Sequence, residues 1–290
     1  MEALFLITGL AALALASYLD IKTREVPDFL SYGMVFIGIG YRSVYSLAYW
    51  DHSYITEGLA GLLVFFGLSY VMFYSGQWGG GDSKVLMGIG ALFGLRPDFY
   101  NFNIAFLINT LIVGAVYGLV WSIVLAASRR RSFANELKEI IHEKDMLRLR
   151  KFMLLLVITL IIISLFISDA KLKLIFFIFI AISLFAYYTW IFTKAVERSC
   201  LLKSVNPEQL TEGDWIVDDI FAGSGKDRKR IAGPKDLGIE MKQIKELIAL
   251  KRRGKFKGKI LIKEGIPFVP SFLLGLILTY LCGNLILAVL

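Results

Sequence analysis

Long runs of apolar residues, separated by shorter polar stretches, dominate the hydrophobic pattern of this chain. Most runs are close to the length, about 20 residues, that an α-helix needs to cross a hydrocarbon core of about 30 Å. The pattern therefore predicts an all-α polytopic membrane protein with about eight membrane segments, one of them short. The segments are residues 3–19, 29–49, 58–75, 83–95, 102–127, 152–168, 172–193 and 271–290.

The fourth segment is too short to cross a bilayer by itself. Residues 83–95 would form a helix of about 20 Å, at 1.5 Å per residue, so we expect it to pack inside the helical bundle. It follows the sequence Gly79-Gly80-Gly81-Asp82 directly. A carboxylate at the start of a membrane helix is costly, and such residues are usually functional.

Polar stretches divide the chain into five predicted parts. The pattern of residues 204–219 predicts short strands and turns, residues 238–251 have helical spacing, and residues 260–262 resemble a strand, which together indicate a small α+β domain. The parts are a membrane core with the Asp82 motif (1–127), a basic cytoplasmic connector (128–151), an extra transmembrane hairpin (152–193), a soluble cytoplasmic domain (194–266) and a C-terminal transmembrane helix (267–290).

Composition supports the membrane assignment and argues against several kinds of site. Apolar residues make up 57% of the 290 positions, against about 45–50% in typical soluble chains. The two cysteines, Cys200 and Cys282, lie far apart, and His52 and His142 are the two histidines. This set supports neither a disulfide framework nor a zinc site, so we expect no metal and no cofactor.

The distribution of positive charge predicts the orientation of the chain. With the N-terminus outside, 28 of the 32 Lys and Arg residues fall in segments on the cytoplasmic side, as the positive-inside rule requires. We therefore expect a multi-pass protein of the cell membrane whose N- and C-termini both lie outside. The net charge of +8 then reflects orientation and attraction to the lipid bilayer, and it needs no nucleic acid as partner.

This orientation identifies a partner for Asp82. The first segment runs inward and ends at Asp20, and the fourth runs outward from Asp82, so both carboxylates lie near the cytoplasmic interface. Glu25 and Asp28 lie on the same side, and we expect Asp28 to be the N-cap of the second segment. Either aspartate alone is also compatible with a structural role, as a helix cap or an interfacial charge.

Two carboxylates in a poorly hydrated site cannot easily both ionise, so the pair would hold one proton between them. This is the requirement of an aspartic protease, in which one carboxylate activates water and the protonated one polarises the scissile carbonyl. The dipole of the helix that begins at Asp82 favours Asp82 as the more ionised member, by about 0.3–1 kcal/mol. Gly79, Gly80 and Gly81 would permit unusual backbone angles, let an extended substrate approach, and allow Asp82 to move.

The two motifs together resemble those of the GxGD aspartic peptidases. Residues 18–27, with the sequence Tyr-Leu-Asp-Ile-Lys-Thr-Arg-Glu-Val-Pro, combined with the glycine run before Asp82, are similar to the type IV prepilin peptidase group and especially to archaeal preflagellin peptidases. The resemblance covers about residues 1–127. Residues 210–290, which include Gly265-Ile266-Pro267-Phe268-Val269-Pro270, resemble a C-terminal extension of some archaeal members, whose role stays open.

The resemblance implies that Asp20 and Asp82 are the catalytic pair of a membrane endopeptidase. Its substrate would be a membrane-bound preflagellin or prepilin precursor, whose short basic leader is removed at the cytoplasmic face. Glu25 and Asp28 are possible contacts of that leader. The cysteine-rich module of many bacterial prepilin peptidases is missing, which argues against N-methylation, and the hairpin 152–193 is extra, so the choice between flagellin and pilin precursors stays open.

Two functions of other classes stay open on the sequence. Membrane carboxylates also relay protons in ion or solute transporters, although such proteins are commonly built from inverted repeats with helices broken at mid-membrane, and we see no convincing repeat. A scaffold of a filament secretion machine, with residues 194–266 as docking module, would leave the two aspartates dispensable. The oligomeric state is not predicted.

Overall fold

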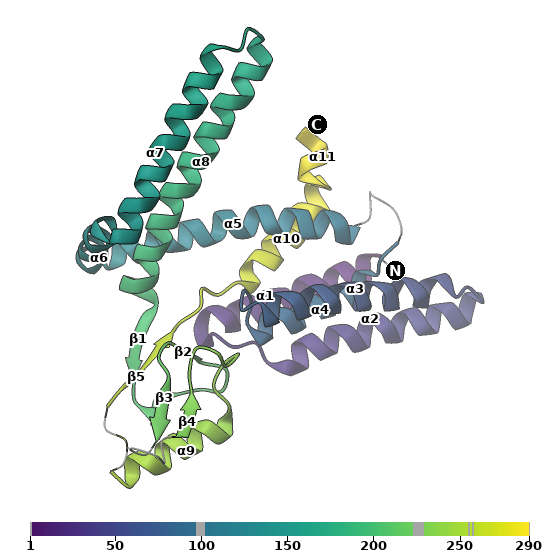
Figure 1. Cartoon of the computed structure of the whole chain (residues 1–290). Coiled ribbons are helices and arrows are strands. Elements are labelled where there is room, and N and C mark those ends of the chain that lie inside the picture. Colours follow the sequence, from purple (N-terminus) through teal and green to yellow (C-terminus); the bar gives the residue numbers. More distant parts are fainter. Residues whose placement is uncertain (1, 97–101, 223–228, 255, 257, 290) are drawn as a thin grey trace. The chain divides into compact units, whose positions relative to one another are not determined.

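A computed structural model of the chain describes residues 2–96, 102–222, 229–254, 256 and 258–289 (Figure 1). The described chain is mostly helical with a few short strands, which confirms the predicted fold class. It divides into two compact units. The first unit holds Met1–Val120, Val205–Ile260 and Gly265–Leu290, and the second holds Trp121–Ser204 and Leu261–Glu264.

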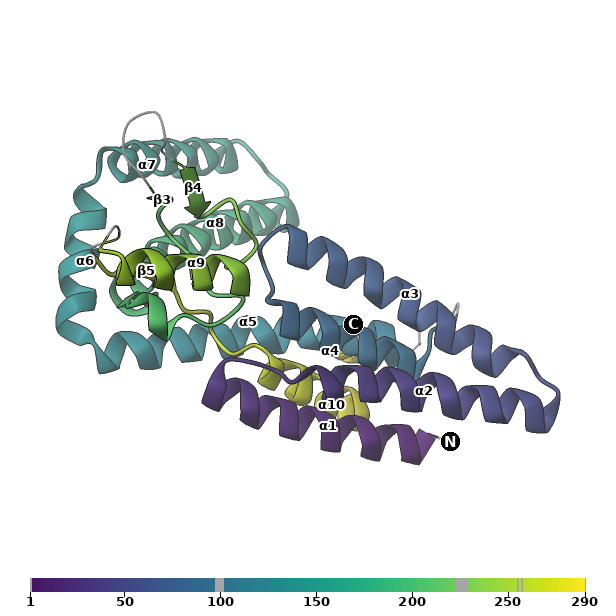
Figure 2. The same ribbon diagram turned by 90° about the horizontal axis from the view of Figure 1, so that it is seen from below.

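Four helices from the N-terminal part of the chain form the centre of the first unit. They are α1 (Glu2–Thr23), α2 (Asp28–Tyr49), α3 (Ser53–Tyr74) and α4 (Gly80–Phe93). Helix α4 packs against α1, α2 and α3, and Figure 2 shows it running beside α2 and α3. Val85, Leu86, Ile89 and Leu92 of α4 are fully buried, so the short segment lies inside the bundle, as its length predicts.

Glycines allow α3 and α4 to approach closely at the middle of the bundle. A side chain added at Gly90 would come within 2.5 Å of the Gly61 carbonyl oxygen and 2.6 Å of the Phe65 Cβ atom. Membrane helices gain little from hydrophobic burial against one another, so such small-residue contacts are a usual source of their tight packing.

The C-terminal helices pack into the same core. They are α10 (Val269–Cys282) and α11 (Leu285–Val289), and α5 (Phe102–Ser128) contributes its part up to Val120 to this unit. Phe272 and Leu276 of α10 are buried together with Leu13 of α1 and Phe106 of α5. Helix α10 thus joins the N-terminal helices in one hydrophobic core.

The C-terminal helix predicted over residues 271–290 is interrupted in the structure. Its first part ends at Gly283, which has a φ of 66°, a left-handed conformation that glycine adopts without strain. Asn109 of α5 binds both sides of the break, because its amide donates to the Gly283 carbonyl at 2.7 Å and accepts from the Leu285 N–H at 3.1 Å. A buried side chain therefore satisfies backbone groups that the helix leaves open.

The remaining part of the first unit contains short strands and one helix. These elements are the 3-10 turn Pro207–Gln209, β2 (Trp215–Ile216), β3 (Ile220–Ala222), β4 (Lys229–Ala232) and α9 (Met241–Arg252). Strands β3 and β4 pair antiparallel, and their register is irregular between Ile220 and Phe221. Ile244 and Leu247 bury one face of α9, as the helical spacing of the sequence predicts.

The second unit is a helical hairpin with a basic helix at its open end. Its helices are α6 (Arg130–His142), α7 (Lys144–Leu165), α8 (Ala170–Val196) and the π-helix Glu197–Leu201, followed by β1 (Leu202–Val205), which has β5 (Ile260–Lys263) as a neighbour. Helices α7 and α8 run side by side (Figure 1). Asp169 caps α8 by accepting the Leu172 N–H at 2.7 Å, so the hairpin turns where the sequence predicts.

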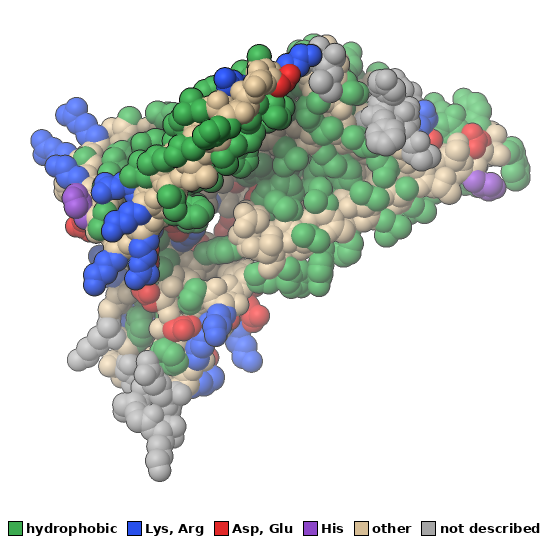
Figure 3. Space-filling view, turned by 45° about the horizontal axis from the view of Figure 1, so that its top comes forward, with side chains coloured by type: hydrophobic (Ala, Val, Ile, Leu, Met, Phe, Trp, Pro, Cys, Tyr) green, Lys and Arg blue, Asp and Glu red, His purple; other side chains and the backbone are tan. Residues whose placement is uncertain are grey.

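Four described helices are long and apolar enough to cross a membrane. They are Ala3–Thr23, Ser53–Tyr74, Phe102–Ser128 and Ala170–Leu201, and a shorter apolar helix is Val269–Cys282. Figure 3 shows hydrophobic side chains in long bands on the visible surface, with Lys and Arg gathered near the ends of these bands. The large apolar residues Phe177 and Phe185 of α8 are 52% and 66% exposed, which suits a lipid environment. The chain is a multi-pass membrane protein.

Candidate active site

Asp20 lies in the last part of α1 and is almost completely buried, with 6% of its surface exposed. Its carboxylate oxygen Oδ2 accepts the backbone N–H of Val269 at 3.0 Å. Val269 is the first residue of α10, so a helix from the far end of the sequence holds this side chain. Arg24 ends α1 in a left-handed conformation, with a φ of 62°, and donates its N–H to the Asp20 carbonyl oxygen at 2.9 Å.

Asp82 lies in the first turn of α4 and is half-buried. Its carboxylate oxygen Oδ2 accepts the N–H of Gly79 at 3.1 Å, so it satisfies an amide that the start of its own helix leaves open. Ser83, the next residue, donates to and accepts from Ser69 of α3, at 3.4 and 2.8 Å. The start of α4 is thereby fixed to the neighbouring helix.

The structure brings the two aspartates together. Helices α1 and α4 pack against each other, and the carboxyl groups of Asp20 and Asp82 are close enough for their charges to interact. Arg24 and Tyr117 of α5 belong to the same electrostatic environment. Tyr117 is a neighbour that sequence reasoning missed, because a tyrosine in an apolar run gives no signal of its partner.

The structure gives a different reason for the glycines at positions 79–81 from the one that the sequence predicts. Gly79 has φ −70° and ψ 164°, an ordinary extended conformation, and Gly80 and Gly81 are already helical, so the predicted unusual angles are not found in these three residues. The positive φ of this loop, 70°, belongs to Gly76. At Gly81 the requirement is space, since an added Cβ would lie 3.3 Å from the Cβ of Val26. This contact joins the second motif to the loop that follows Asp20.

The two predicted leader contacts occupy different surroundings. Glu25 is exposed in the loop after α1. Asp28 is the first residue of α2, and its carboxylate pairs with the ammonium of Lys84 at 2.6 Å. The predicted N-cap role of Asp28 is wrong, because Pro27 takes the extended N-cap position and Asp28 lies one residue further on. Asp28 instead links α2 to α4 beside Asp82.

The segment Gly265–Val269, which leads into α10, contacts residues of both motifs, and we call it the entry segment. Arg24 donates to the carbonyl oxygen of Gly265 at 3.0 Å. Phe268 packs on Trp78, which directly precedes the glycine run, with ring centroids 5.5 Å apart. The sequence motif whose role stayed open therefore lies against the site.

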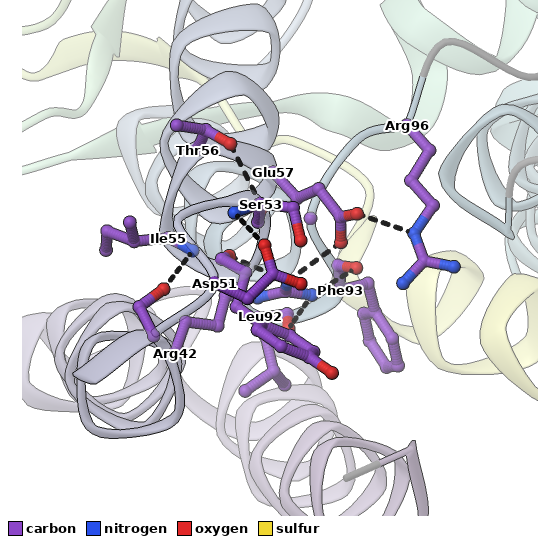
Figure 4. Close-up of polar contacts among 12 residues, drawn as sticks. Arg42, Asp51, Ser53, Ile55, Thr56, Glu57, Leu92, Phe93 and Arg96 are labelled. Atoms are coloured by element: carbon purple, nitrogen blue, oxygen red, sulfur yellow. Dashed lines mark hydrogen bonds and ion pairs between the residues drawn. The ribbon is translucent and has the colours of Figure 1, made fainter. Parts of the chain in front are cut away.

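A second charged cluster lies at the other end of α4 (Figure 4). Arg42 of α2 is buried and donates to the carbonyl oxygens of Phe93 and Leu92, at 2.7 and 3.4 Å. It also pairs with Glu57 at 3.4 Å, and Glu57 pairs with Arg96 at 2.7 Å. Sequence reasoning missed this cluster, although a lone arginine inside an apolar run is the signal that could have revealed it.

Acidic, histidine and cysteine side chains of the described residues form no group of three or more that could hold a metal ion. The two cysteines are not joined to each other, and Cys200 is buried whereas Cys282 is exposed.

Residues 7–124 match the model of the type IV leader peptidase family. Both aspartates and the glycine run lie within the matched residues, so the resemblance carried by the two motifs is confirmed.

Individual relatives agree with this assignment. The chain is 40% identical over 86 residues to the preflagellin peptidase of Methanocaldococcus jannaschii, which covers 30% of this chain and 36% of that protein. It is 36% identical over 86 residues to the preflagellin peptidase of Methanococcus maripaludis, covering 30% of this chain and 37% of that protein. The match thus spans about a third of the length of each of these relatives.

A third relative matches over almost the whole length. The prepilin peptidase EppA of Methanothermobacter thermautotrophicus is 20% identical in an alignment of 373 residues, which covers 98% of this chain and 95% of that protein. No solved structure is significantly similar to the chain.

Proposed function

We propose that this protein is a membrane aspartic endopeptidase that removes the short basic leader from a preflagellin or prepilin precursor. The observation that supports this proposal is that the charges of Asp20 and Asp82 lie close enough to interact, within the residues that match the leader peptidase family. The substrate class follows from relatives that are named preflagellin and prepilin peptidases.

The proposed mechanism uses one proton shared between the two carboxyl groups, since like charges in a poorly hydrated site resist double ionisation. The ionised carboxylate takes a proton from water, and the resulting hydroxide attacks the scissile carbonyl carbon while the protonated carboxyl group hydrogen-bonds the carbonyl oxygen. The carbon–nitrogen bond then breaks, and the leaving amine takes a proton from the pair. This chemistry requires neither a metal nor a cofactor.

The substrate would approach from the membrane with its basic leader on the cytoplasmic side. The basic loops of the chain favour this orientation, with both termini outside and the two aspartates near the cytoplasmic face. In this arrangement Gly79, Gly80 and Gly81 expose backbone to an extended peptide, and Glu25 and Asp28 attract the leader. Both acidic side chains are exposed, as such contacts need.

The test is cleavage of Methanococcus maripaludis preflagellin by the full-length protein in membranes, followed as a mobility shift. Asp20→Asn and Asp82→Asn should each reduce cleavage by about 10⁴-fold or more, while the protein still inserts. Asp51→Asn is the matched control, because this exposed carboxylate caps the start of α3 through the Ser53 N–H and asparagine keeps that acceptor. Full cleavage by either of the first two variants would refute the catalytic pair.

Chelation provides an independent check on the class of protease. EDTA should leave cleavage unchanged, because the carboxyl pair needs no metal ion. If EDTA abolished cleavage and added divalent metal restored it, a metallopeptidase would replace the aspartic mechanism. Normal precursor processing by an Asp20→Asn, Asp82→Asn double variant would favour a scaffold role.

A further inference from the structure

The entry segment joins the C-terminal helix to the candidate catalytic pair. Given the proposed function, we infer that this segment positions Asp20 and keeps it as the carboxylate of the pair. Asp20 is then the base that activates water, and Asp82 is the acid that binds the scissile carbonyl. Val269 acts through its backbone N–H, so it is a positioning residue.

The first argument is the hydrogen bond between Val269 and Asp20. Amides in the first turn of a helix have no partner within that helix, and the Val269 N–H uses this freedom to donate to Asp20 Oδ2 at 3.0 Å. The neighbouring Pro270 has no N–H. Asp20 is 6% exposed, so this amide replaces water as a donor at a buried carboxylate.

The second argument is that the entry segment is fixed at several points. Arg24 holds the carbonyl oxygen of Gly265 at 3.0 Å. Phe268 packs on the rings of Trp78 and Phe272, at centroid distances of 5.5 and 5.4 Å, and these two rings also contact each other at 5.5 Å. An added Cβ at Gly114 of α5 would come within 2.9 Å of the Phe268 ring, so the segment also fits closely against α5.

The third argument compares the surroundings of the two carboxyl groups. Asp20 receives an amide from a different helix and lies in the field of the Arg24 guanidinium. Asp82 receives the amide of Gly79 in its own helix cap and faces the charge of Asp20. Tyr117 is the titratable group that α5 adds to this environment.

Because donors and positive charge favour an ionised carboxylate, the proton of the pair is expected on Asp82. This is the reverse of the assignment that the dipole of α4 alone predicts. The sequence shows one helix N-terminus at the pair, that of the helix carrying Asp82, whereas the structure places a second one at Asp20.

The direct test replaces the Val269 amide with an ester, by incorporating the α-hydroxy analogue of valine at this position of the full-length protein. The side chain stays, and only the N–H is lost. The kcat for M. maripaludis preflagellin should fall about 10- to 100-fold, the range for a hydrogen bond to a charged group. The KM should stay within about twofold, because substrate binding is not altered.

The pH dependence separates positioning from a merely structural role. A carboxylate that loses a donor takes up a proton more readily, so the acid limb of the pH–rate profile should move to higher pH in the Val269 ester. The same ester at Phe272 is the matched control, since it removes a backbone N–H one turn further along α10. That control should leave the acid limb unchanged.

Conventional mutagenesis gives a second route. Val269→Pro removes the same N–H, and Val269→Ala keeps it, so kcat should fall in the first variant and stay near wild type in the second. If Val269→Pro does not fold, the ester variant decides the outcome. Retained thermal stability in detergent identifies variants that can be compared.

Hydrogen exchange tests the contact without relying on cleavage. Among residues 266–271, Pro267 and Pro270 carry no N–H, so a peptide over this range reports on few amides. Asp20→Ala should speed exchange in this peptide by about tenfold or more, because the Val269 amide loses its acceptor, whereas Asp82→Ala should not. Equal exchange in both variants would contradict the inferred contact.

The outcomes distinguish this inference from the proposed function. If Asp20→Asn and Asp82→Asn abolish cleavage but the Val269 ester keeps the wild-type kcat and pH profile, the inference is overturned and the peptidase assignment stands. If either asparagine variant cleaves at the full rate, the catalytic pair fails and the inference fails with it. An ester variant that is faster than wild type would mean that the entry segment obstructs the site, which also overturns a positioning role.

Discussion

The two ends of α4 carry charged groups of opposite character. At the N-terminal end, the carboxyl groups of Asp82 and Asp20 are close enough for their charges to interact, and they accept the backbone N–H groups of Gly79 and Val269. At the C-terminal end, the Arg42 guanidinium donates to the last carbonyl groups of the helix (Figure 4). An anion at the start of a helix and a cation at its end both match the helix dipole.

The difference lies in how the charges are balanced. Arg42 has a carboxylate partner in Glu57, which in turn binds Arg96, so opposite charges meet at that end. Asp20 and Asp82 bring like charges together in surroundings with little water. Such an arrangement does not stabilise the fold. We therefore associate the N-terminal end of α4, with its two aspartates, with chemistry, and the C-terminal end, with Arg42, with stability.

The largest effect that would test this comparison is the removal of the buried arginine. Arg42→Met should destabilise the protein by about 3 kcal/mol, because it leaves the carboxylate of Glu57 and the end carbonyls of α4 without their buried donor. Arg96→Met should cost no more than about 1 kcal/mol, since the Arg96 side chain is 64% exposed and exposed pairs contribute little. The measurement is reversible unfolding in detergent, followed by helical circular dichroism.

Unfolding and cleavage measurements on the aspartate variants complete the comparison of the two ends of α4. Asp20→Asn and Asp82→Asn should lose cleavage without a comparable loss of stability, whereas Arg42→Met should lose stability while the folded fraction keeps its specific activity. If Arg42→Met unfolds like Arg96→Met, the buried cluster is not the structural site inferred here. If both aspartate variants are as destabilised as Arg42→Met, the two aspartates at the N-terminal end of α4 have a structural role.

The proximity of Asp20 and Asp82 could be predicted because it depends on helix direction and charge distribution, which the sequence contains; their catalytic role stays a prediction. The burial of α4 could be predicted from its length. In contrast, the Val269 N–H is a backbone donor 249 positions away from Asp20. Any residue other than proline carries such a donor, so the residue types gave no sign of this contact.

Other features carried a signal that was interpreted too simply. Arg42 is a lone positive charge inside an apolar run of the sequence, although a buried arginine needs several acceptors, and these include backbone carbonyls that the sequence cannot display. Asp28 was expected to cap its helix, but proline at the preceding position takes the cap and leaves the carboxylate to Lys84. Gly283 interrupts the last apolar run, which hydrophobicity alone describes as continuous.

A smaller effect is expected from Asp28, the first residue of α2, which lies beside the site of Asp20 and Asp82. Asp28→Asn should raise the KM for preflagellin about threefold to tenfold and leave kcat unchanged, because an exposed charge contributes about 1 kcal/mol to attraction of a basic leader. The difference between wild type and variant should shrink at high salt, since exposed charges are screened. Steady-state cleavage at low and high ionic strength measures both effects.

Lys84→Met is the informative comparison for this prediction. The Asp28 side chain is 58% exposed although it pairs with Lys84, so removing the lysine frees its carboxylate for the leader. The KM of this variant should therefore not rise. Equal increases in KM for Asp28→Asn and Lys84→Met would mean that the ion pair organises the loop and that Asp28 is not a leader contact.

The smallest predicted effect concerns Glu143, which forms a partly exposed counterpart of the Glu57 cluster in the second unit. Its carboxylate binds Lys194 at 2.7 Å and also pairs with Arg198. Hydrogen bonds from these two cations lower the pKa of Glu143 below its usual value. A lowered pKa means that the pair stabilises the folded state above the usual glutamate pKa and loses this contribution as the pH falls through the lowered value.

Glu143→Gln should therefore lower the unfolding temperature slightly at pH 7. The difference from wild type should begin to shrink as the pH falls below about 4.3, the usual glutamate pKa of an unfolded chain, and should disappear below the lowered pKa of Glu143. Unfolding curves of the two proteins between about pH 3 and 8 measure this change. Because the site is partly exposed, added salt should also reduce the difference at pH 7. If the difference in unfolding temperature persists at acid pH, the shape and packing of the Glu143 side chain, not its charge, stabilise this end of the hairpin. The Glu143 and Glu57 clusters would then stabilise the protein in different ways.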